Sequence, residues 1–454
     1  MTDADSGGAE PAASADVRSE DGTADVRSED DTADVRSENH PADARSEDDT
    51  AEPTPLLTPA GGVPPVSVTP HEIQEAATRL ASGHGSFAVD AERASGFRYS
   101  NRAYLVQIHR DGAGTVLIDP VNHGADVLTA LAPLAEVLAT DEWVLHAADQ
   151  DLPCLAEIGL RPTKLYDTEL AGRLAGYDRV NLATMVERLL GLGLKKGHGA
   201  ADWSKRPLPA EWLNYAALDV EVLIELETAV AAVLEEQGKS EWAAQEFEYL
   251  RTFEGTPTRR DRWRRTSGIH KVRDRRAMAA VRELWTTRDH IARRRDIAPG
   301  RILPDSAIIA AAVADPKTVA ELTALPIFGG NKQRRSAKVW LDALSRARDN
   351  PDPPEISEPQ NGPPPASRWA RRKPEAAARL EAARAGLAEL SARVSVPTEN
   401  LVTPEVVRRL CWDWKPAADT EAAVAEFLEN AAARPWQREL VVPVLAAALA
   451  NAKP

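Results

Sequence analysis

The sequence has 454 residues, enough for about three domains, and 43% of them are hydrophobic, so the chain can form sizeable cores. Its net charge is −15, and no apolar run approaches the roughly 18–20 residues that a bilayer span needs, in keeping with a mean hydropathy of −0.37. The polar N-terminus is unlike a signal peptide, and two cysteines, Cys154 and Cys411, are too few for a disulfide framework or a CxxC zinc site. We therefore expect a cytoplasmic protein with no membrane association.

Residues 1–68 are predicted to form a disordered acidic tail. The nine-residue unit ADVRSEDGT, which begins at Ala15, is followed by three near-copies that end at Thr50. The unit has no aromatic residue and at most one apolar residue beyond alanine, so stacked copies would bury almost no surface. Residues 1–70 carry 17 acidic side chains and 4 arginines, a net charge of −13. A Pro-rich connector from Pro53 to Pro70 tethers the tail to the first folded domain.

Residues 69–250 are predicted to form an α/β domain with a mixed sheet flanked by helices. The segments 86–90 and 103–109 are typical of strands, and a turn at Asp111-Gly112 leads into a third strand at 115–119. Strands that come first and then alternate with helices indicate this class. The remaining predicted elements are a strand at 143–146 and helices at 125–139, 151–158, 167–176, 180–191 and 210–236.

Two all-helical blocks follow, at residues 265–350 and 368–454, with a Pro-rich linker at 351–367 between them. The first is basic, since residues 251–350 hold 23 Lys and Arg against 11 Asp and Glu, a net charge of +12. The blocks align at an offset of 99 residues: Ile302-Leu303 matches Leu401-Val402, and Ala307-Ile308 matches Val406-Val407. We interpret the blocks as two copies of one helical module.

The first candidate for catalytic chemistry is the pair Asp90 and Glu92 at the end of an apolar strand. Side chains alternate along a strand, so these two carboxylates point to the same face of the sheet. They repel each other unless a cation lies between them, and oxygen ligands suit Mg²⁺ or Mn²⁺. Asp-x-Glu recurs at Asp219 and Asp419, but only the first copy follows an apolar strand.

Two more carboxylates and a tyrosine lie further along the chain. Asp151 stands where a strand that ends at His146 runs into a helix, a place that also suits a helix N-cap. Tyr215 and Asp219 are four residues apart and so share one helix face, a spacing that also fits an ordinary half-buried ring. His146 is interpreted as a hydrogen-bonded core residue and not as a metal ligand.

Strand Asp-x-Glu, then His-Ala-x-x-x-Asp-Leu, then helix Tyr-x-x-x-Asp, in this order, resembles the DEDDy-type 3′–5′ exonucleases, and most closely the ribonuclease D family. The segments 105–108, 167–171 and 201–208 are similar to that family as well. The block at 265–350 resembles an HRDC domain at residues 303–306 and 322–326. The resemblance covers roughly residues 69–450. It implies a ribonuclease H-like exonuclease domain followed by an HRDC domain and a second HRDC-like domain.

The resemblance also implies roles for the five residues. Asp90, Glu92 and Asp219 would bind two divalent ions, Mg²⁺ or Mn²⁺, while Asp151 would act through water and Tyr215 would orient the attacking water. Two ions about 3.5–4 Å apart can activate water and stabilise the leaving oxygen. A phenol with a pKa of about 10 is a poor base at neutral pH, so positioning is the more suitable role for Tyr215.

The activity implied is a 3′–5′ exoribonuclease that releases 5′-mononucleotides from single-stranded 3′ ends, with tRNA precursors and other small structured RNAs as substrates. We expect a monomer. Two other functions stay open at this point: a 3′–5′ DNA exonuclease with the same metal site, and a catalytically silent nucleic-acid-binding protein. The intact set of five residues argues against the second.

Several side chains are candidates for RNA binding. The Gly-rich loop 191–199 lacks the P-loop order, so Lys195 and Lys196 belong either to a plain surface loop or to a contact with the RNA backbone. Trp203 could stack on a base or pack in the interior. Arg206 is a further candidate, and the pair Arg334 and Arg335 represents the phosphate-binding patch, or the solvated surface, of the basic block.

Overall fold

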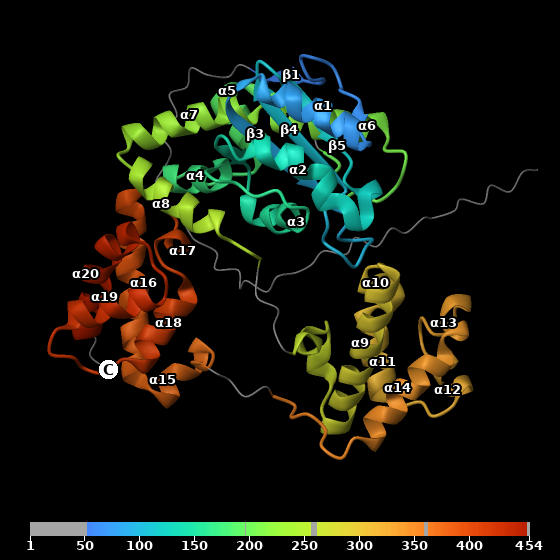
Figure 1. Cartoon of the computed structure of the whole chain (residues 1–454). Helices are drawn as coiled ribbons and strands as arrows, with labels where there is room; N and C mark the ends of the chain where they lie inside the picture. The colour runs from blue at the N-terminus through green and yellow to red at the C-terminus, as the bar shows by residue number, and fades with distance from the viewer. Residues whose placement is uncertain (1–51, 196, 256–260, 358–361, 452–454) are drawn as a thin grey trace, which may run out of the picture. The chain divides into compact units, whose positions relative to one another are not determined.

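A computed structural model describes residues 52–195, 197–255, 261–357 and 362–451 (Figure 1). The repeats predicted at residues 15–50 lie outside this part of the chain. Within it, no helix combines the length and the apolar character needed to cross a membrane.

A six-stranded sheet organises the α/β domain. Strand β3 pairs in antiparallel fashion with β4 and in parallel with β6, so the sheet is mixed, as predicted. In spatial order its strands are β2 (Val66–Ser67), β5 (Gly114–Ile118), β4 (Leu105–Asp111), β3 (His84–Glu92), β6 (Trp143–Leu145) and β7 (Leu165–Asp167).

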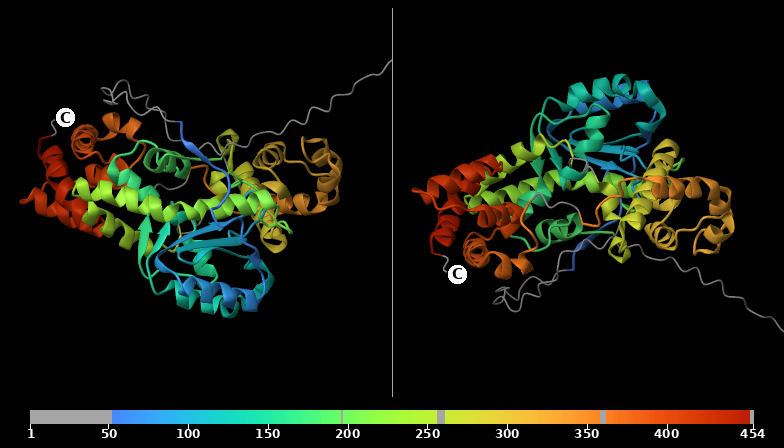
Figure 2. Two further views of the ribbon diagram at one scale, coloured as in Figure 1. Left: turned by 90° about the horizontal axis from the view of Figure 1, so that it is seen from above. Right: turned by 90° about the horizontal axis from the view of Figure 1, so that it is seen from below.

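Helices cover both faces of this sheet because apolar side chains alternate along its central strand. Phe87 and Val89 of β3 pack with one set of helices, and Ala88 packs with another. The first set is α1 (Pro70–Ala81), α2 (Val127–Leu138) and α3 (Leu152–Glu157). Figure 2 shows α1 and α2 side by side on their face of the sheet, with α7 (Leu223–Glu236) on the other. Asp90 and Glu92 share the face of Ala88.

The second face is covered by α4 (Thr168–Ala175), α5 (Leu182–Leu190), α6 (Ala210–Glu221) and α7. The single helix predicted at 210–236 is therefore divided at Val222. The division follows from packing, because α6 lies on β3, β4 and β5, whereas α7 lies on β3 and β6. Helix α8 (Ser240–Arg251) ends the domain.

The Pro-rich connector is folded in part. Strand β1 (Thr54–Leu56) pairs in parallel with β8 (Leu192–Leu194), and the Thr54 backbone N–H donates to the Gly191 carbonyl at 2.9 Å. Strand β2 pairs with β5. The predicted end of the tail at residue 68 is therefore too late, because Leu56 supplies apolar surface that packs against the core.

The two helical domains repeat one arrangement, which confirms the internal repeat. The same offset of 99 residues relates α9 (Arg275–Arg295) to α16 (Pro374–Val394), α10 (Pro299–Ile302) to α17 (Thr398–Leu401), and α11 (Asp305–Ala314) to α18 (Pro404–Asp413). Each long helix ends on a residue with positive φ, Asp296 at 47° and Ser395 at 49°. The other helices are α12 (Val319–Ala324), α13 (Asn331–Arg335), α14 (Ala337–Asp349), α15 (Trp369–Arg372), α19 (Thr420–Asn430) and α20 (Pro435–Asn451).

The second helical domain shares a core with the α/β domain. Trp242 of α8 stacks on Trp436 of α20 with ring centroids 5.0 Å apart. The Trp436 indole N–H donates to Glu246 at 2.8 Å, and Arg434 pairs with the same carboxylate at 2.7 Å. Removing the second helical domain would therefore expose a buried face of α8.

The first helical domain has its own core around Trp340 and Phe328. It touches the α/β domain through the loop that follows β3. The Ala298 N–H donates to the Phe97 carbonyl at 2.9 Å, and Tyr99 donates to Asp289 at 3.0 Å.

We expect Trp436→Ala to lower the free energy of unfolding by about 3–5 kcal/mol, because it deletes a buried ring and leaves the Glu246 carboxylate without its indole donor. The measurement is guanidinium unfolding followed by circular dichroism. Leu128→Ala, at a side chain that is 56% exposed, is the control and should stay within about 0.5 kcal/mol of the parent. Equal stability of the two variants would contradict the shared core.

Candidate active site

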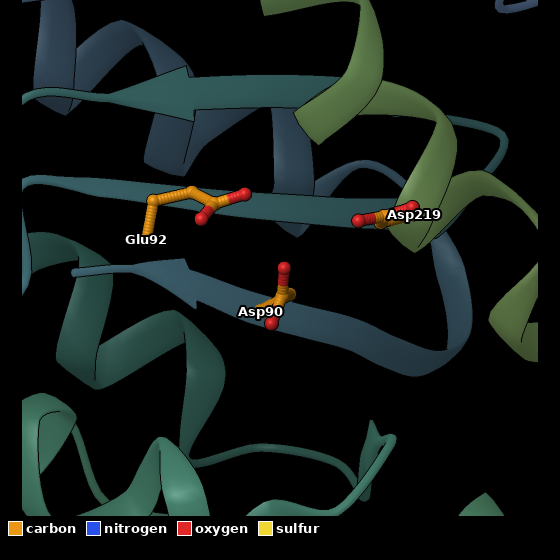
Figure 3. Close-up of side chains that lie close together, drawn as sticks. All are labelled: Asp90, Glu92 and Asp219. Atoms are coloured by element: carbon orange, nitrogen blue, oxygen red, sulfur yellow. The ribbon is translucent and has the colours of Figure 1, made fainter. Parts of the chain in front are cut away.

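Three carboxylates converge at one point of the sheet face. Asp90 and Glu92 extend from β3, and Asp219 reaches them from α6, which crosses the same strand (Figure 3). One carboxylate oxygen from each residue lies within 4.8 Å of the others. Strand alternation places Asp90 and Glu92 side by side, and the fold adds Asp219, a helix residue more than 120 positions further along the chain.

Burial makes this cluster electrostatically costly. Desolvation raises the pKa of Glu92 well above its ordinary range, and repulsion from Asp90 and Asp219 raises it further. Burial, with repulsion from Asp90, also raises the pKa of Asp219 to about 8. A cation favours the charged form of all three carboxylates, and an all-oxygen donor set suits a divalent ion such as Mg²⁺ or Mn²⁺.

Gln107 on β4 fixes the first of these carboxylates. It lies opposite Asp90 in the antiparallel register, and its side-chain amide donates to Asp90 Oδ2 at 2.7 Å. The residue is fully buried, and its own Oε1 has no hydrogen-bond partner among the described residues. Sequence reasoning gave Gln107 no role, although a lone amide inside the apolar strand 103–109 was a signal that it needs a polar partner.

Asp151 lies beside the cluster and does not act as a helix cap. It stands at the N-cap position of α3, but its side chain makes no capping hydrogen bond. The side chain is buried, with Arg93 Nη2 at 3.4 Å from Oδ1. Burial and the charge of Asp90 raise the pKa of its carboxyl well above the ordinary range. Because the carboxylate does not cap the helix, it is available to the site.

The turn that carries Asp151 is held by a second buried carboxylate. Asp167, at the N-terminus of α4, accepts the backbone N–H groups of Ala147 at 3.1 Å and Ala148 at 2.7 Å, as well as two from α4. Ala147 has a φ of 59°, so the turn needs such support. His146 pairs with Thr168 at 2.9 Å, which confirms it as a hydrogen-bonded residue, and burial lowers its pKa to about 4.

Tyr215 lies one helical turn before Asp219 on α6. Burial and the Asp219 carboxylate raise the pKa of the phenol, and hydrogen bonding by its hydroxyl lowers the pKa of Asp219 in turn. A phenol that stays protonated can donate a hydrogen bond but cannot serve as a base. Tyr215, Asp151 and the three convergent carboxylates all line one cavity of about 690 Å³.

One of the RNA-binding predictions is wrong, and a second predicted residue makes contacts inside the protein. Trp203 is fully buried and donates its indole N–H to the His198 carbonyl at 3.2 Å, so it cannot stack on a base. Arg206 forms an ion pair with Asp119 at 2.6 Å and donates to the Tyr104 carbonyl at 2.6 Å. Its guanidinium joins the sheet to the loop before α6, but the side chain is still 29% exposed, so phosphate binding by Arg206 stays a prediction.

The other basic candidates stay predictions. Lys195 is exposed in the loop that follows β8, and Lys196 lies outside the described residues. Arg334 and Arg335 are both exposed on α13.

Comparison with known proteins follows the same division of the chain. Residues 65–235 match the 3′–5′ exonuclease domain family, residues 277–344 match the HRDC domain, and residues 362–449 match the 3′ to 5′ exonuclease C-terminal domain. Ribonuclease D of Nitrobacter hamburgensis is 30% identical over 337 residues, which are 72% of this chain and 80% of that protein. The chain belongs to the ribonuclease D family. As a member of that family it is a 3′–5′ exoribonuclease, as the sequence motifs indicated.

A second curated relative and two solved structures are also similar to this chain. Ribonuclease D of Acidiphilium cryptum is 32% identical, with 65% of this chain and 76% of that protein covered. A crystal structure of a protein from Bifidobacterium adolescentis matches with a TM-score of 0.79 and 38% identity, over 88% of this chain and all of the other. Escherichia coli RNase D shares the fold, with a TM-score of 0.61 and 22% identity over 86% of this chain and 99% of that one.

Asp219→Asn is expected to weaken the binding of Mg²⁺ at least tenfold, because it removes one of three carboxylates that face one another. The measurement is the rise in melting temperature on addition of Mg²⁺, which reports a ligand that binds the folded chain. In EDTA the variant should unfold at the same temperature as the parent or higher, since repulsion among the three carboxyl groups is reduced.

The control is Glu211→Gln, an exposed carboxyl on the same helix, which should keep the full response to Mg²⁺. An Asp219→Asn variant stabilised by Mg²⁺ as strongly as the parent would remove Asp219 from the metal site.

Proposed function

We propose that this chain removes 3′-terminal nucleotides from RNA as 5′-monophosphates, by divalent-metal-dependent hydrolysis at the cluster of Asp90, Glu92 and Asp219. The observation that carries the proposal is the convergence of these carboxylates within 4.8 Å in a member of the ribonuclease D family. A phosphodiester is anionic, so an acidic cluster serves its hydrolysis only with cations in place.

The three convergent carboxylates would hold the metal, and Asp151 beside Asp90 adds a fourth negative charge, enough to suit two ions of Mg²⁺ or Mn²⁺. Bound there, divalent cations supply Lewis-acid activation of water and stabilisation of the leaving 3′-oxygen.

The chain's own side chains orient the reacting groups. The Tyr215 hydroxyl, kept protonated by its surroundings, would donate its one hydrogen to Asp219, and its oxygen would accept a hydrogen bond from the attacking water. Gln107 locks the rotamer of Asp90 from the neighbouring strand. Arg93, which lines the same cavity, orients the Asp151 carboxylate through their ion pair. It also offers a positive charge to the phosphate that enters.

We propose single-stranded 3′ ends of tRNA precursors and other small structured RNAs as the substrates. The basic first helical domain supports this choice, because a folded RNA reaches well beyond the cavity and meets the exposed Arg334 and Arg335 on α13. We further propose an exonuclease domain that ends near residue 250, an HRDC domain at 265–350 and a second HRDC-like domain at 368–454.

The test is a time course of nucleotide release from a 3′-tailed tRNA by the full chain, with Mg²⁺, Mn²⁺ or EDTA. We expect 5′-mononucleotides with either metal and none in EDTA, and faster release from an all-RNA oligonucleotide than from an all-DNA one. Asp219→Asn should be inactive. No metal-dependent release by the parent chain would overturn the proposal, and equal rates on RNA and DNA would overturn its specificity.

We expect the double variant Arg334→Ala/Arg335→Ala to reduce the salt dependence of tRNA binding. Each lost phosphate contact should lower the slope of log K against log salt by about 0.7–0.9. The measurement is binding of one tRNA precursor to the full chain across a range of salt concentrations. Truncation after α8 is unsuitable, because it would expose the face that Trp436 covers.

The matched control is Arg371→Ala/Arg372→Ala, an exposed pair on α15 of the second helical domain, which tests the effect of lost charge alone. Equal slopes for the α13 variant and the parent would mean that Arg334 and Arg335 do not touch phosphate.

A further inference from the structure

The loop between β8 and α6 lies directly on the ring of Tyr215. A Cβ atom added at Gly197 would stand 1.7 Å from Tyr215 Cε2 and 2.3 Å from Cζ. Atoms cannot approach that closely, so only a residue without a side chain lets the backbone rest on the ring.

The loop is anchored at its C-terminal side by aromatic packing and hydrogen bonds. The His198 ring meets Tyr215 edge-on, with centroids 5.9 Å apart, and lies 6.1 Å from Trp212. The His198 carbonyl accepts the indole N–H of buried Trp203 at 3.2 Å and the backbone N–H of Ala201 at 2.8 Å. These contacts fix residues 198–203 against α6.

The N-terminal side of the loop is anchored by β8, which pairs with β1. The same N-terminal segment also holds α6, because Asn214, the residue before the tyrosine, donates its side-chain amide to the Leu57 carbonyl at 2.9 Å. Strand β1 lies outside the stretch at 65–235 that matches the 3′–5′ exonuclease domain family. A segment of the connector thus ties the loop and the helix together.

From this packing we infer that Gly197 is a positioning residue for hydrolysis, which sets the Tyr215 hydroxyl by supporting its ring. The inference rests on the role proposed for Tyr215. The hydroxyl of a half-buried tyrosine ring moves when the ring tilts. Misplacement of a reacting group by about 1 Å can lower a rate by about 100-fold. The loop removes that freedom.

A substitution at Gly197 should therefore slow catalysis without lowering the stability of the fold. The group it strikes is the free end of a side chain, so the ring can swing away while the backbone stays in place. Gly197 is exposed, and the fold around it needs no repacking. A methyl group at Gly199 would stand 3.9 Å from the Tyr215 hydroxyl, an ordinary contact, which makes Gly199→Ala the matched variant.

The experiment compares the full chain with Gly197→Ala, Gly199→Ala, Tyr215→Phe and the double variant Gly197→Ala/Tyr215→Phe. The substrate is a short RNA oligonucleotide at saturating Mg²⁺. Tyr215→Phe should lower kcat by roughly 10- to 1000-fold, the range of one positioned group. Gly197→Ala should lower kcat at least tenfold with KM and melting temperature unchanged, and Gly199→Ala should lose much less. The double variant should be no slower than Tyr215→Phe, because the glycine acts through the hydroxyl.

A second readout does not depend on activity. The chain has six tyrosines, and with 3-fluorotyrosine in each, the fluorine signal missing from Tyr215→Phe identifies residue 215. We expect that signal to shift in Gly197→Ala and to stay in place in Gly199→Ala. An unshifted signal, or equal kcat in the two glycine variants, would overturn the inference even if Tyr215→Phe is slow.

If the fold-losses in kcat of the two single variants multiply in the double variant, Gly197 acts independently of the tyrosine, which would also overturn the inference. Full activity of Tyr215→Phe would overturn both the role of Tyr215 and that of Gly197. Absence of Mg²⁺-dependent release by the parent chain would instead overturn the proposed function, a result distinct from all of these.

Discussion

Mutual repulsion among buried carboxylates is the constraint around which the α/β domain is arranged. Asp90, Glu92 and Asp219 are held close together, and repulsion from Asp90 raises the pKa of both Glu92 and Asp219. The free energy of folding must offset that cost until a cation arrives. Neighbouring groups hold the carboxylates in place. Gln107 donates a hydrogen bond to Asp90, and Asp167 supports the turn that carries the fourth carboxylate, Asp151. Binding of a cation would reduce this repulsion and so stabilise the folded chain.

Local rules were sufficient to predict the parts of the site that depend on local geometry. Strand alternation placed Asp90 and Glu92 on one face, and helical spacing placed Tyr215 beside Asp219. For Asp151 the sequence left a cap and a catalytic carboxylate open, because only the missing capping hydrogen bond distinguishes them. Pairing partners far apart in the chain were not predictable. Gln107 opposite Asp90 and β1 against β8 depend on register, which one-dimensional patterns do not carry.

The same limit explains the wrong prediction for Trp203 and the unpredicted internal contacts of Arg206. Both residue types suit nucleic acids, and both stand in a loop, yet the tertiary structure uses them internally. The excess positive charge of the first helical domain is the sum over many residues, so it does not depend on whether one of them makes internal contacts. That domain also holds the loop beyond Glu92, since Ala298 and Asp289 bond to Phe97 and Tyr99. The region proposed to bind RNA is thus linked to the rim of the cavity.

The two helical domains, although built to one plan, differ in how they attach, and this difference has a consequence for cooperativity. Apolar residues of the second helical domain belong to the same core as α4 and α7, whereas the first encloses a core of its own. Residues that share a core gain and lose order together. On heating, calorimetry should therefore resolve two events, one for the basic helical domain and one for the remainder. The chain's three segments would then behave as two thermodynamic units, with residues distant in sequence melting as one.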